Sequence, residues 1–304
     1  MESPEECMKN HQIRALTQIA ESGSIRAAAR AMHLSQSSLT KALRELEEDV
    51  GAELLVRSYK GIEFTLAGQA LLTHARLALS VLDKAREEIR LIRGGAGAHV
   101  AVALSPLLAI EVLPKVSKIF ARLQPDAELS LSEGFLSSLV PALLEGRLDF
   151  AVAIADPADL PYELVFETLA PVVALPAGRR GHPLAGARNW EALQEATWVM
   201  NFSAGSQSET LVAWLRENGH PVPRKIVKCT SPMLMAELMR RTDMVGFCPT
   251  TLLDDATYGS GLHRFEIEPL PPPMALGLIT LRGVPLSSAA RPLAALFVRH
   301  LKVE

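Results

Sequence analysis

The stretch SIRAAARAMHLSQSSLTKALRELEEDVG, residues 24–51, predicts two short helices separated by a tight turn. Ser24 and Ser35 stand where each helix would begin, and serine is a favoured N-cap because its hydroxyl accepts a hydrogen bond from a free backbone N–H. In the second helix, apolar side chains recur at i, i+3, i+4, i+7 and i+11: Leu39, Ala42, Leu43, Leu46 and Val50. This spacing buries one stripe of the helix. With a helical pattern over residues 13–20, it predicts a three-helix unit.

The opposite face of the second helix is polar. Within its first turns it carries short hydrogen-bonding side chains followed by cations: Gln36, Ser37, Thr40, Lys41 and Arg44. Amide and hydroxyl groups can read base edges in a major groove, whereas Lys and Arg reach guanine or phosphate. The acidic residues 45–49 lie at the far end, away from a duplex that the helix enters by its N-terminal half. The pattern favours DNA binding. The alternative is an ordinary three-helix packing unit with a solvated polar face.

After Gly51, the segments AELLVR (52–57), SYKG (58–61) and IEFTL (62–66) predict a short hairpin with a glycine turn. Such a wing would contact the neighbouring DNA backbone through Arg57 and Lys60. Residues 1–98 contain 13 Lys and Arg against 13 Asp and Glu, so net charge cannot supply the affinity. Affinity would come from the placement of the cations and from doubling of the site in a dimer.

A long helical pattern runs from Thr65 to Arg93. Its apolar side chains are spaced alternately by four and three, as in a coiled coil: Leu71, Ala75, Ala78, Leu82, Ala85, Ile89 and Ile92. A helix of this length measures roughly 40 Å, too long to be buried along its whole length in a unit of this size. We therefore expect a homodimer that presents two recognition helices to a two-fold site. The alternative is a helix that lies on its own C-terminal domain.

The remaining two-thirds of the chain reads as α/β. The glycine-rich segment GGAGA, residues 94–98, predicts a hinge. Beyond it, short β-rich runs such as HVAVALS (99–105), DFAVAI (149–154) and MVGFC (244–248) alternate with helical patterns. Alternation of this kind predicts parallel strands covered by helices, in one unit or two smaller ones.

Composition excludes several classes of protein. With 48% hydrophobic and 21% charged residues among 304, the chain is not intrinsically disordered, and a net charge of −3 argues against coating nucleic acid by bulk charge. No apolar run reaches the length of a membrane span, so we expect no membrane partner. The N-terminus lacks the pattern of a secretory signal, and the three cysteines form no CxxC pair. These features predict a cytoplasmic protein.

The sequence resembles the LysR-type transcriptional regulators. The resemblance is specific over residues 22–72 and continues more weakly in LLEGRLDFAVAI (143–154), GHPLA (181–185) and VGFCP (245–249). It implies double-stranded DNA and RNA polymerase as partners and a dimer or tetramer as the assembly. The DNA-contacting positions of the family correspond here to Gln36, Ser37, Ser38, Thr40, Lys41, Arg44 and Arg57.

The resemblance also implies a domain plan. It consists of a winged helix-turn-helix domain (1–66), a linker dimerisation helix (67–93), a hinge (94–98), and an effector part shaped like a two-lobed periplasmic binding protein, with lobe 1 at 99–168 and 266–304 and lobe 2 at 169–265. Two positions depart from the family pattern. Ser37 stands where the family very often has proline, and Arg241-Thr242-Asp243 replaces a stretch that is usually rich in glycine.

Between two α/β lobes, ligands bind at the carboxyl ends of strands, where helix N-termini offer free N–H groups. Residues with this layout, and phenylalanines that could wall the cleft, are Ser105, Pro106, Phe135, Asn201, Phe202, Ser203, Thr230 and Phe247. They predict a small organic anion as effector, with aromatic compounds among the candidates. Each polar member can equally be a routine helix cap, and each phenylalanine a core residue.

Other functions find less support in the sequence. We find no HExxH, GxSxG, Walker or GxGxxG pattern, so we expect neither an enzyme nor a metal or other cofactor. Cys229 and Cys248 each end a predicted strand, and a redox-responsive regulator of the same family is one alternative. A solute-binding receptor is another, although it would have no need of the first ninety residues.

Overall fold

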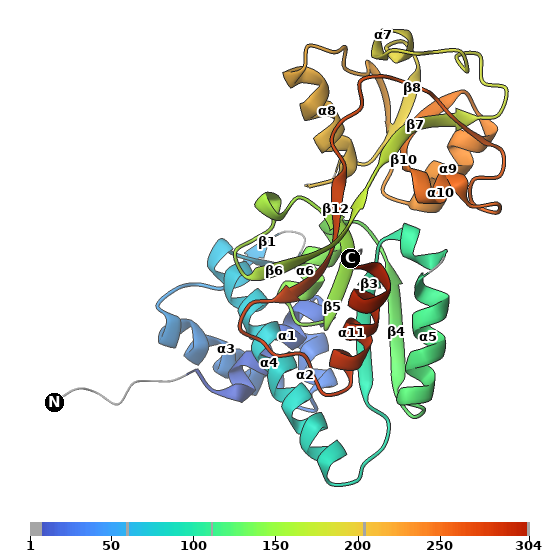
Figure 1. Ribbon diagram of the computed structural model, residues 1–304. Coiled ribbons are helices and arrows are strands. Elements are labelled where there is room, and N and C mark those ends of the chain that lie inside the picture. Colours follow the sequence, from blue (N-terminus) through green and yellow to red (C-terminus); the bar gives the residue numbers. More distant parts are fainter. Residues whose placement is uncertain (1–7, 59–60, 111, 203–204, 303–304) are drawn as a thin grey trace. The chain divides into compact units, whose positions relative to one another are not determined.

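The computed structural model describes residues 8–58, 61–110, 112–202 and 205–302, which form two compact units (Figure 1). The first unit begins with three helices, α1 (Asn10–Ser22), α2 (Ile25–Ala31) and α3 (Gln36–Val50). Both predicted serine caps are confirmed. The Ala27 N–H donates to Ser24 Oγ at 3.1 Å, and the Ser38 N–H donates to Ser35 Oγ at 3.0 Å.

The core of this unit is the apolar stripe of α3 packed against α1 and α2. Leu39 and Leu46 are fully buried there with Leu16 and Ile19 of α1. Beyond α3 a winged hairpin forms, in which strand β1 (Leu55–Ser58) pairs antiparallel with β2 (Gly61–Phe64). The Glu47 carboxylate accepts the backbone N–H groups of residues 54 and 55, which ties the end of α3 to the start of the wing.

The long helix α4 runs from Leu66 to Ile92. Thr65 caps it, because its Oγ1 accepts the Gly68 N–H at 3.0 Å. The first two positions of the predicted coiled-coil seam, Leu71 and Ala75, pack into the core of the first unit. The seam available to a partner helix is therefore shorter than predicted and begins at Ala78.

The second unit contains two lobes, each built on a five-stranded sheet (Figure 1). In lobe 1 the strand order is β4-β3-β5-β12-β6, with the bounds β3 His99–Leu104, β4 Glu128–Glu133, β5 Phe150–Ala155, β6 Leu164–Val172 and β12 Met274–Leu281. Helices α5 (Val112–Leu123) and α11 (Ala290–Leu301) bury apolar side chains against one face of this sheet. Helix α6 (Leu136–Leu144) completes the main helices of the lobe.

In lobe 2 the strand order is β11-β7-β10-β8-β9, with the bounds β7 Ala174–Arg179, β8 Thr197–Met200, β9 Lys225–Lys228, β10 Met244–Pro249 and β11 Leu262–Arg264. Its helices are α7 Trp190–Leu193, α8 Gln207–Glu217, α9 Pro232–Arg241 and α10 Thr250–Asp254. Successive side chains of a strand point to opposite faces. Accordingly, Trp198 and Met200 pack with α7 and α8, whereas Val199 packs with α9 on the other face (Figure 1).

The crossovers between the lobes correct the predicted boundaries. The chain leaves the lobe 1 sheet after Val172, so residues 169–172 belong to lobe 1 and not to lobe 2. It returns at Met274, while Phe265 and Ile267 remain in the lobe 2 core. The strands next to each crossover also run antiparallel to their neighbours, so the sheets are mixed and not parallel throughout. The cause is the direct passage of one strand into the other sheet without a covering helix.

We expect Gly68→Ala to destabilise the first unit. A Cβ at this position would lie 2.0 Å from the Leu54 carbonyl oxygen, and a backbone atom cannot rotate away as a side chain would. Overpacking of this kind costs about 1–3 kcal/mol of unfolding free energy. In urea, circular dichroism of the variant should show loss of helix at a lower urea concentration than in the unmodified chain. The three tryptophans all lie in lobe 2, so the urea midpoint of their fluorescence should be unchanged. Gly186→Ala, which meets nothing within 4 Å, is the control. A shared shift of both signals would contradict this assignment.

Candidate functional site

The polar face of α3 is a continuous exposed surface. The five side chains that the spacing aligned line one shallow hollow: Gln36, Ser37, Thr40, Lys41 and Arg44. The buried stripe of α3 on the opposite side holds this face toward solvent. Ser38 is exposed as well, although its hydroxyl lies 2.7 Å from Ser35 Oγ within the cap. At position 37, where the family pattern very often has proline, Ser37 Oγ contacts Ser35 Oγ at 2.8 Å.

The two cations of this face are paired with acidic residues one turn further along. Lys41 Nζ lies 3.7 Å from Glu45 Oε1, and Arg44 Nε lies 2.8 Å from Glu48 Oε1. Exposed pairs at this spacing contribute only about 0.3–0.5 kcal/mol. A phosphate group can therefore draw either cation away at small cost. Of the predicted wing contacts, Arg57 lies on β1, but its side chain and the whole of Lys60 are outside the described residues.

The second half of α4 exposes an apolar face. Leu82, Ile89 and Ile92 are 45%, 58% and 80% exposed, although they belong to the coiled-coil spacing. Large apolar side chains at regular helical spacing rarely stay in water when a partner can cover them. The second half of α4 therefore has an apolar face that is open to solvent within the chain.

Within the second unit, a cavity of about 130 Å³ lies between the lobes at the carboxyl ends of their strands. Four of the predicted effector residues line it: Ser105, Pro106, Phe135 and Phe247. These residues come from lobe 1 after β3, from the start of α6, and from β10 of lobe 2. Strands from distant parts of the sequence thus bring these four residues to one cavity wall.

Three other predicted residues are not among the side chains that line this cavity. Asn201 is buried, and its backbone carbonyl accepts the Ser206 hydroxyl at 2.6 Å. Phe202 packs against the lobe 2 core with Lys228 Nζ 5.9 Å from its ring centroid, and Thr230 is exposed. Ser203 lies outside the described residues. Sequence position after a strand was a poor guide here, because the chain turns before α8 and presents later residues to the cavity.

The sequence reasoning missed much of the wall. The lining residues that it did not name include Leu136, Gln207, Met235, Met239 and Leu252. Met235 and Met239 lie four residues apart on α9, and this spacing could have indicated a shared face. For Gln207 no comparable signal exists, since it is the first residue of α8 and reads as an ordinary polar surface position.

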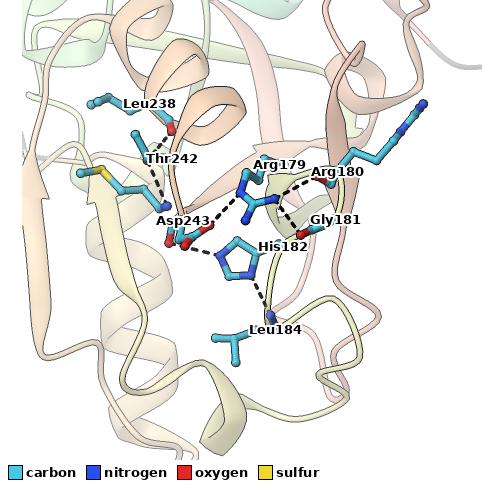
Figure 2. Close-up of polar contacts among 9 residues, drawn as sticks. Arg179, Arg180, Gly181, His182, Leu184, Leu238, Thr242 and Asp243 are labelled. Carbon is cyan, nitrogen blue, oxygen red and sulfur yellow. Dashed lines mark hydrogen bonds and ion pairs between the residues drawn. The ribbon is translucent and has the colours of Figure 1, made fainter.

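Figure 2 shows the hydrogen bonds that hold Thr242 and Asp243, in the stretch where the family pattern is usually rich in glycine. The Asp243 carboxylate accepts Arg179 Nε at 2.7 Å, and its carbonyl oxygen lies 3.2 Å from His182 Nε2. His182 Nδ1 accepts the Leu184 N–H at 2.9 Å, so Nε2 carries the proton in the neutral ring and donates to Asp243. The end of α9 is thereby fixed to the end of β7.

The two cysteines that the structure describes, Cys229 and Cys248, do not have the surroundings of a redox switch. Burial raises the pKa of the Cys248 thiol to about 12, against a smaller opposing effect of Arg240. Reactive cysteines have lowered pKa values because the thiolate is the nucleophile. Cys229 is half-buried, and its thiol donates to the Ser231 carbonyl oxygen at 3.5 Å. The redox-responsive alternative is therefore not favoured.

In the part of the chain that the structure describes, no three His, Cys, Asp or Glu side chains are grouped to hold a metal ion. Among the same residues, no helix combines the length and the apolar character needed to cross a membrane.

Two family models match the chain. Residues 10–69 match "Bacterial regulatory helix-turn-helix protein, lysR family", and residues 93–302 match "LysR substrate binding domain". Among curated proteins, the HTH-type transcriptional regulator TdcA of Escherichia coli (strain K12) is 27% identical over 266 residues, which cover 86% of this chain and 82% of TdcA.

Solved structures show the same fold. The crystal structure of CbnR, a LysR family transcriptional regulator, covers 97% of this chain and 100% of its own, with a TM-score of 0.66 and 19% identity. Full-length CbnR in complex with its target DNA covers 96% and 98% of the two chains, with a TM-score of 0.64 and 21% identity. These likenesses extend over both units of the chain.

The raised pKa of Cys248 makes a prediction about its reactivity. At pH 8 the thiolate fraction should be roughly a thousandfold smaller than for a thiol at the ordinary value of 9.0. Alkylation of Cys248 by iodoacetamide, followed by mass spectrometry, should be slow in the folded protein and should accelerate about tenfold per pH unit above 8. In urea-unfolded chain, Cys229 and Cys248 should react alike. Labelling of folded Cys248 at the unfolded rate would exclude this explanation.

Proposed function

Because the chain belongs to the LysR family of bacterial DNA-binding transcriptional regulators, we propose that it is a dimeric regulator whose DNA binding responds to a small organic effector held between its two lobes. The chain has the helix-turn-helix domain and the substrate-binding domain of that family. Members of the family are transcription regulators and not enzymes. The single observation that carries the DNA-binding part is the alignment of the five predicted contact residues along one exposed hollow of α3.

We propose that α3 enters the major groove by its N-terminal half. Gln36, Ser37 and Thr40 would then face base edges, while Lys41 and Arg44 would reach phosphate or guanine. Thr40 Oγ1 donates to the Gln36 carbonyl oxygen at 2.8 Å, which leaves its lone pairs and methyl group for the DNA. Ser38 would contact phosphate, and Arg57 and Lys60 of the wing would contact the backbone. That CbnR binds its target DNA in a related fold supports this arrangement.

The occupant that we propose for the exposed apolar face of α4 is the same face of a second copy. A two-fold dimer would present two α3 helices to two half-sites one helical turn apart or a multiple of it. Two such dimers could form a tetramer on longer operators. Since the target is chromosomal DNA, we infer a cytoplasmic location, and since the role is control of transcription, we propose RNA polymerase as a further partner.

For the effector, we propose the cavity lined by Ser105, Pro106, Phe135 and Phe247. Its volume of about 130 Å³ compares with engineered cavities of about 150 Å³ that bind benzene, so a six-membered ring fits the enclosed part. A ligand that touches both lobes stabilises the arrangement in which it makes more contacts. Regulation then requires that this arrangement and the alternative have different affinities for the operator.

We expect Gln36→Ala and Arg57→Ala to separate sequence reading from backbone binding. Loss of a base contact should reduce the preference for operator over random DNA at least fivefold, since a good pair is worth about 1–3 kcal/mol of discrimination. Loss of a phosphate contact should weaken both DNAs by similar factors and lower the salt slope by about one. Fluorescence anisotropy at several salt concentrations measures both quantities. Equal loss of specificity in the two variants would contradict the proposed division.

Ile89→Glu should dissociate the dimer. The substitution places a charge in the apolar face of α4, and we propose that the partner covers this face. Burying an unpaired carboxylate there is strongly unfavourable. Light scattering coupled to size exclusion should show a monomer at concentrations where the unmodified chain is a dimer. Met233→Glu, at a 75% exposed site on α9, makes the same change away from this face and should leave the dimer intact. An unchanged mass for Ile89→Glu would place the dimer contact elsewhere.

A further inference from the structure

The cavity between the lobes has no charged side chain on its described wall. Its lining is almost entirely apolar, and its polar side chains are those of Ser105, Ser206, Gln207 and Cys248. The Ser206 hydroxyl has no proton left for a ligand, because it donates to the Asn201 carbonyl oxygen at 2.6 Å; it also accepts the Glu209 N–H at 3.3 Å. A carboxylate moved from water to such a wall would lose its hydration without gaining a cation.

The start of α8, where an anion could be expected, already faces a carboxylate of the protein. Glu209 Oε2 accepts the Gly205 N–H at 3.1 Å, immediately before the first turn of this helix. A negative side chain in the first turn uses the favourable field of the helix end. The wall of the cavity as described therefore offers no positive side chain to the anionic effector that the sequence predicted.

Gln207 supplies an unmet hydrogen-bonding group on the same wall. Its side-chain Nε2 is buried and has no hydrogen-bond partner among the described residues, while the side chain as a whole lines the cavity. A buried amide donor without a partner costs about 1–3 kcal/mol. The side chain lines the main cavity and also a small cavity beside the crossover segments, bounded by Val172 and Pro271. A rotation of the side chain that brings Nε2 to an acceptor on a ligand in the cavity would recover the lost hydrogen bond.

The Cys248 thiol belongs to the same lining. Burial raises its pKa to about 12 despite the opposing effect of Arg240. The anionic form of this thiol is therefore disfavoured relative to its neutral form.

From these observations we infer that the effector is an uncharged, ring-sized molecule with one hydrogen-bond acceptor, such as a carbonyl oxygen, and that Gln207 selects it by donating to that acceptor. This inference rests on the proposed effector cavity and names the chemical class of its ligand. The apolar body would lie against Phe135, Met235 and Met239, whose soft side chains adapt to flat rings.

Three probes of similar shape test the inference on the full-length protein. Acetophenone is neutral and carries an acceptor, α-methylstyrene replaces its carbonyl oxygen with a methylene group, and benzoate replaces its methyl group with a charged oxygen. Calorimetric titration should give tightest binding for acetophenone, about fivefold to tenfold weaker binding for α-methylstyrene, and at least tenfold weaker binding for benzoate. With ¹³C-methyl methionine, the signals of Met235 and Met239 among the nine methionines should move, which places the probe in the cavity.

The variant Gln207→Leu should bind acetophenone and α-methylstyrene with equal affinity, because the donor is gone while the volume is kept. Gln124→Leu, the same change at a residue outside the cavity lining, should keep the wild-type ratio. Preference for benzoate, equal binding of the two neutral probes by the wild-type protein, or absence of binding by all three would overturn the inference. The comparison of the three probes on the wild-type protein tests the inference even if a variant fails to fold.

The failure of this inference can be told apart from failure of the proposed function. Operator binding by the same samples, measured by anisotropy without probe, depends on α3 and not on the cavity. If benzoate binds best and changes operator affinity, the proposal of an effector-controlled regulator is supported and the proposal of an uncharged effector is contradicted. If acetophenone binds as expected but operator and random DNA are bound alike, the uncharged effector is supported and the proposed regulation is contradicted.

Discussion

Burial of the apolar stripe of α3 against α1 and α2 is the constraint on which DNA recognition by this protein depends. Because Leu39 and Leu46 are fully buried, the helix can have only one rotation about its axis. That rotation sends every polar side chain of the first turns outward together. The acidic end of the same helix serves the fold as well, since Glu47 binds the start of the wing. One helix thus orders both the surface that we propose reads DNA and the hairpin beside it.

The same opposition of apolar and polar faces shapes α4. Near its start the helix is fixed by the Thr65 cap and by the close approach of Gly68 to Leu54, so its first turns belong to the DNA-binding core. Further along, the apolar side chains continue with no protein surface of the first unit to cover them. Helix α4 is anchored at one end and has an exposed apolar face at the other. Such a helix suits the proposed role of joining two copies and setting the distance between their α3 helices.

In the second unit, the two crossovers bring the carboxyl ends of strands from both sheets to a common cavity. Free N–H groups at such strand ends make anions the usual expectation for these folds. Here that potential is largely consumed within the protein, by the hydroxyl of Ser206 and the carboxylate of Glu209. What remains is a mostly apolar wall with the amide of Gln207, the hydroxyl of Ser105 and the thiol of Cys248. The electrostatics of the site therefore depend less on its place in the fold than on which side chains cap its helices.

The sequence by itself determined the helix-turn-helix unit, because caps and a 3.6-residue period act between residues a few positions apart. Ser24, Ser35 and the stripe of α3 needed no knowledge of the rest of the chain. It also located four of the residues that line the cavity, among them Ser105 and Phe135, through strand-end patterns. Only the tertiary structure decided that Gln207 and Met239 complete that wall while Asn201 and Thr230 do not. Such contacts join segments a hundred residues apart, and their selection depends on strand order and crossover position, which no local spacing encodes.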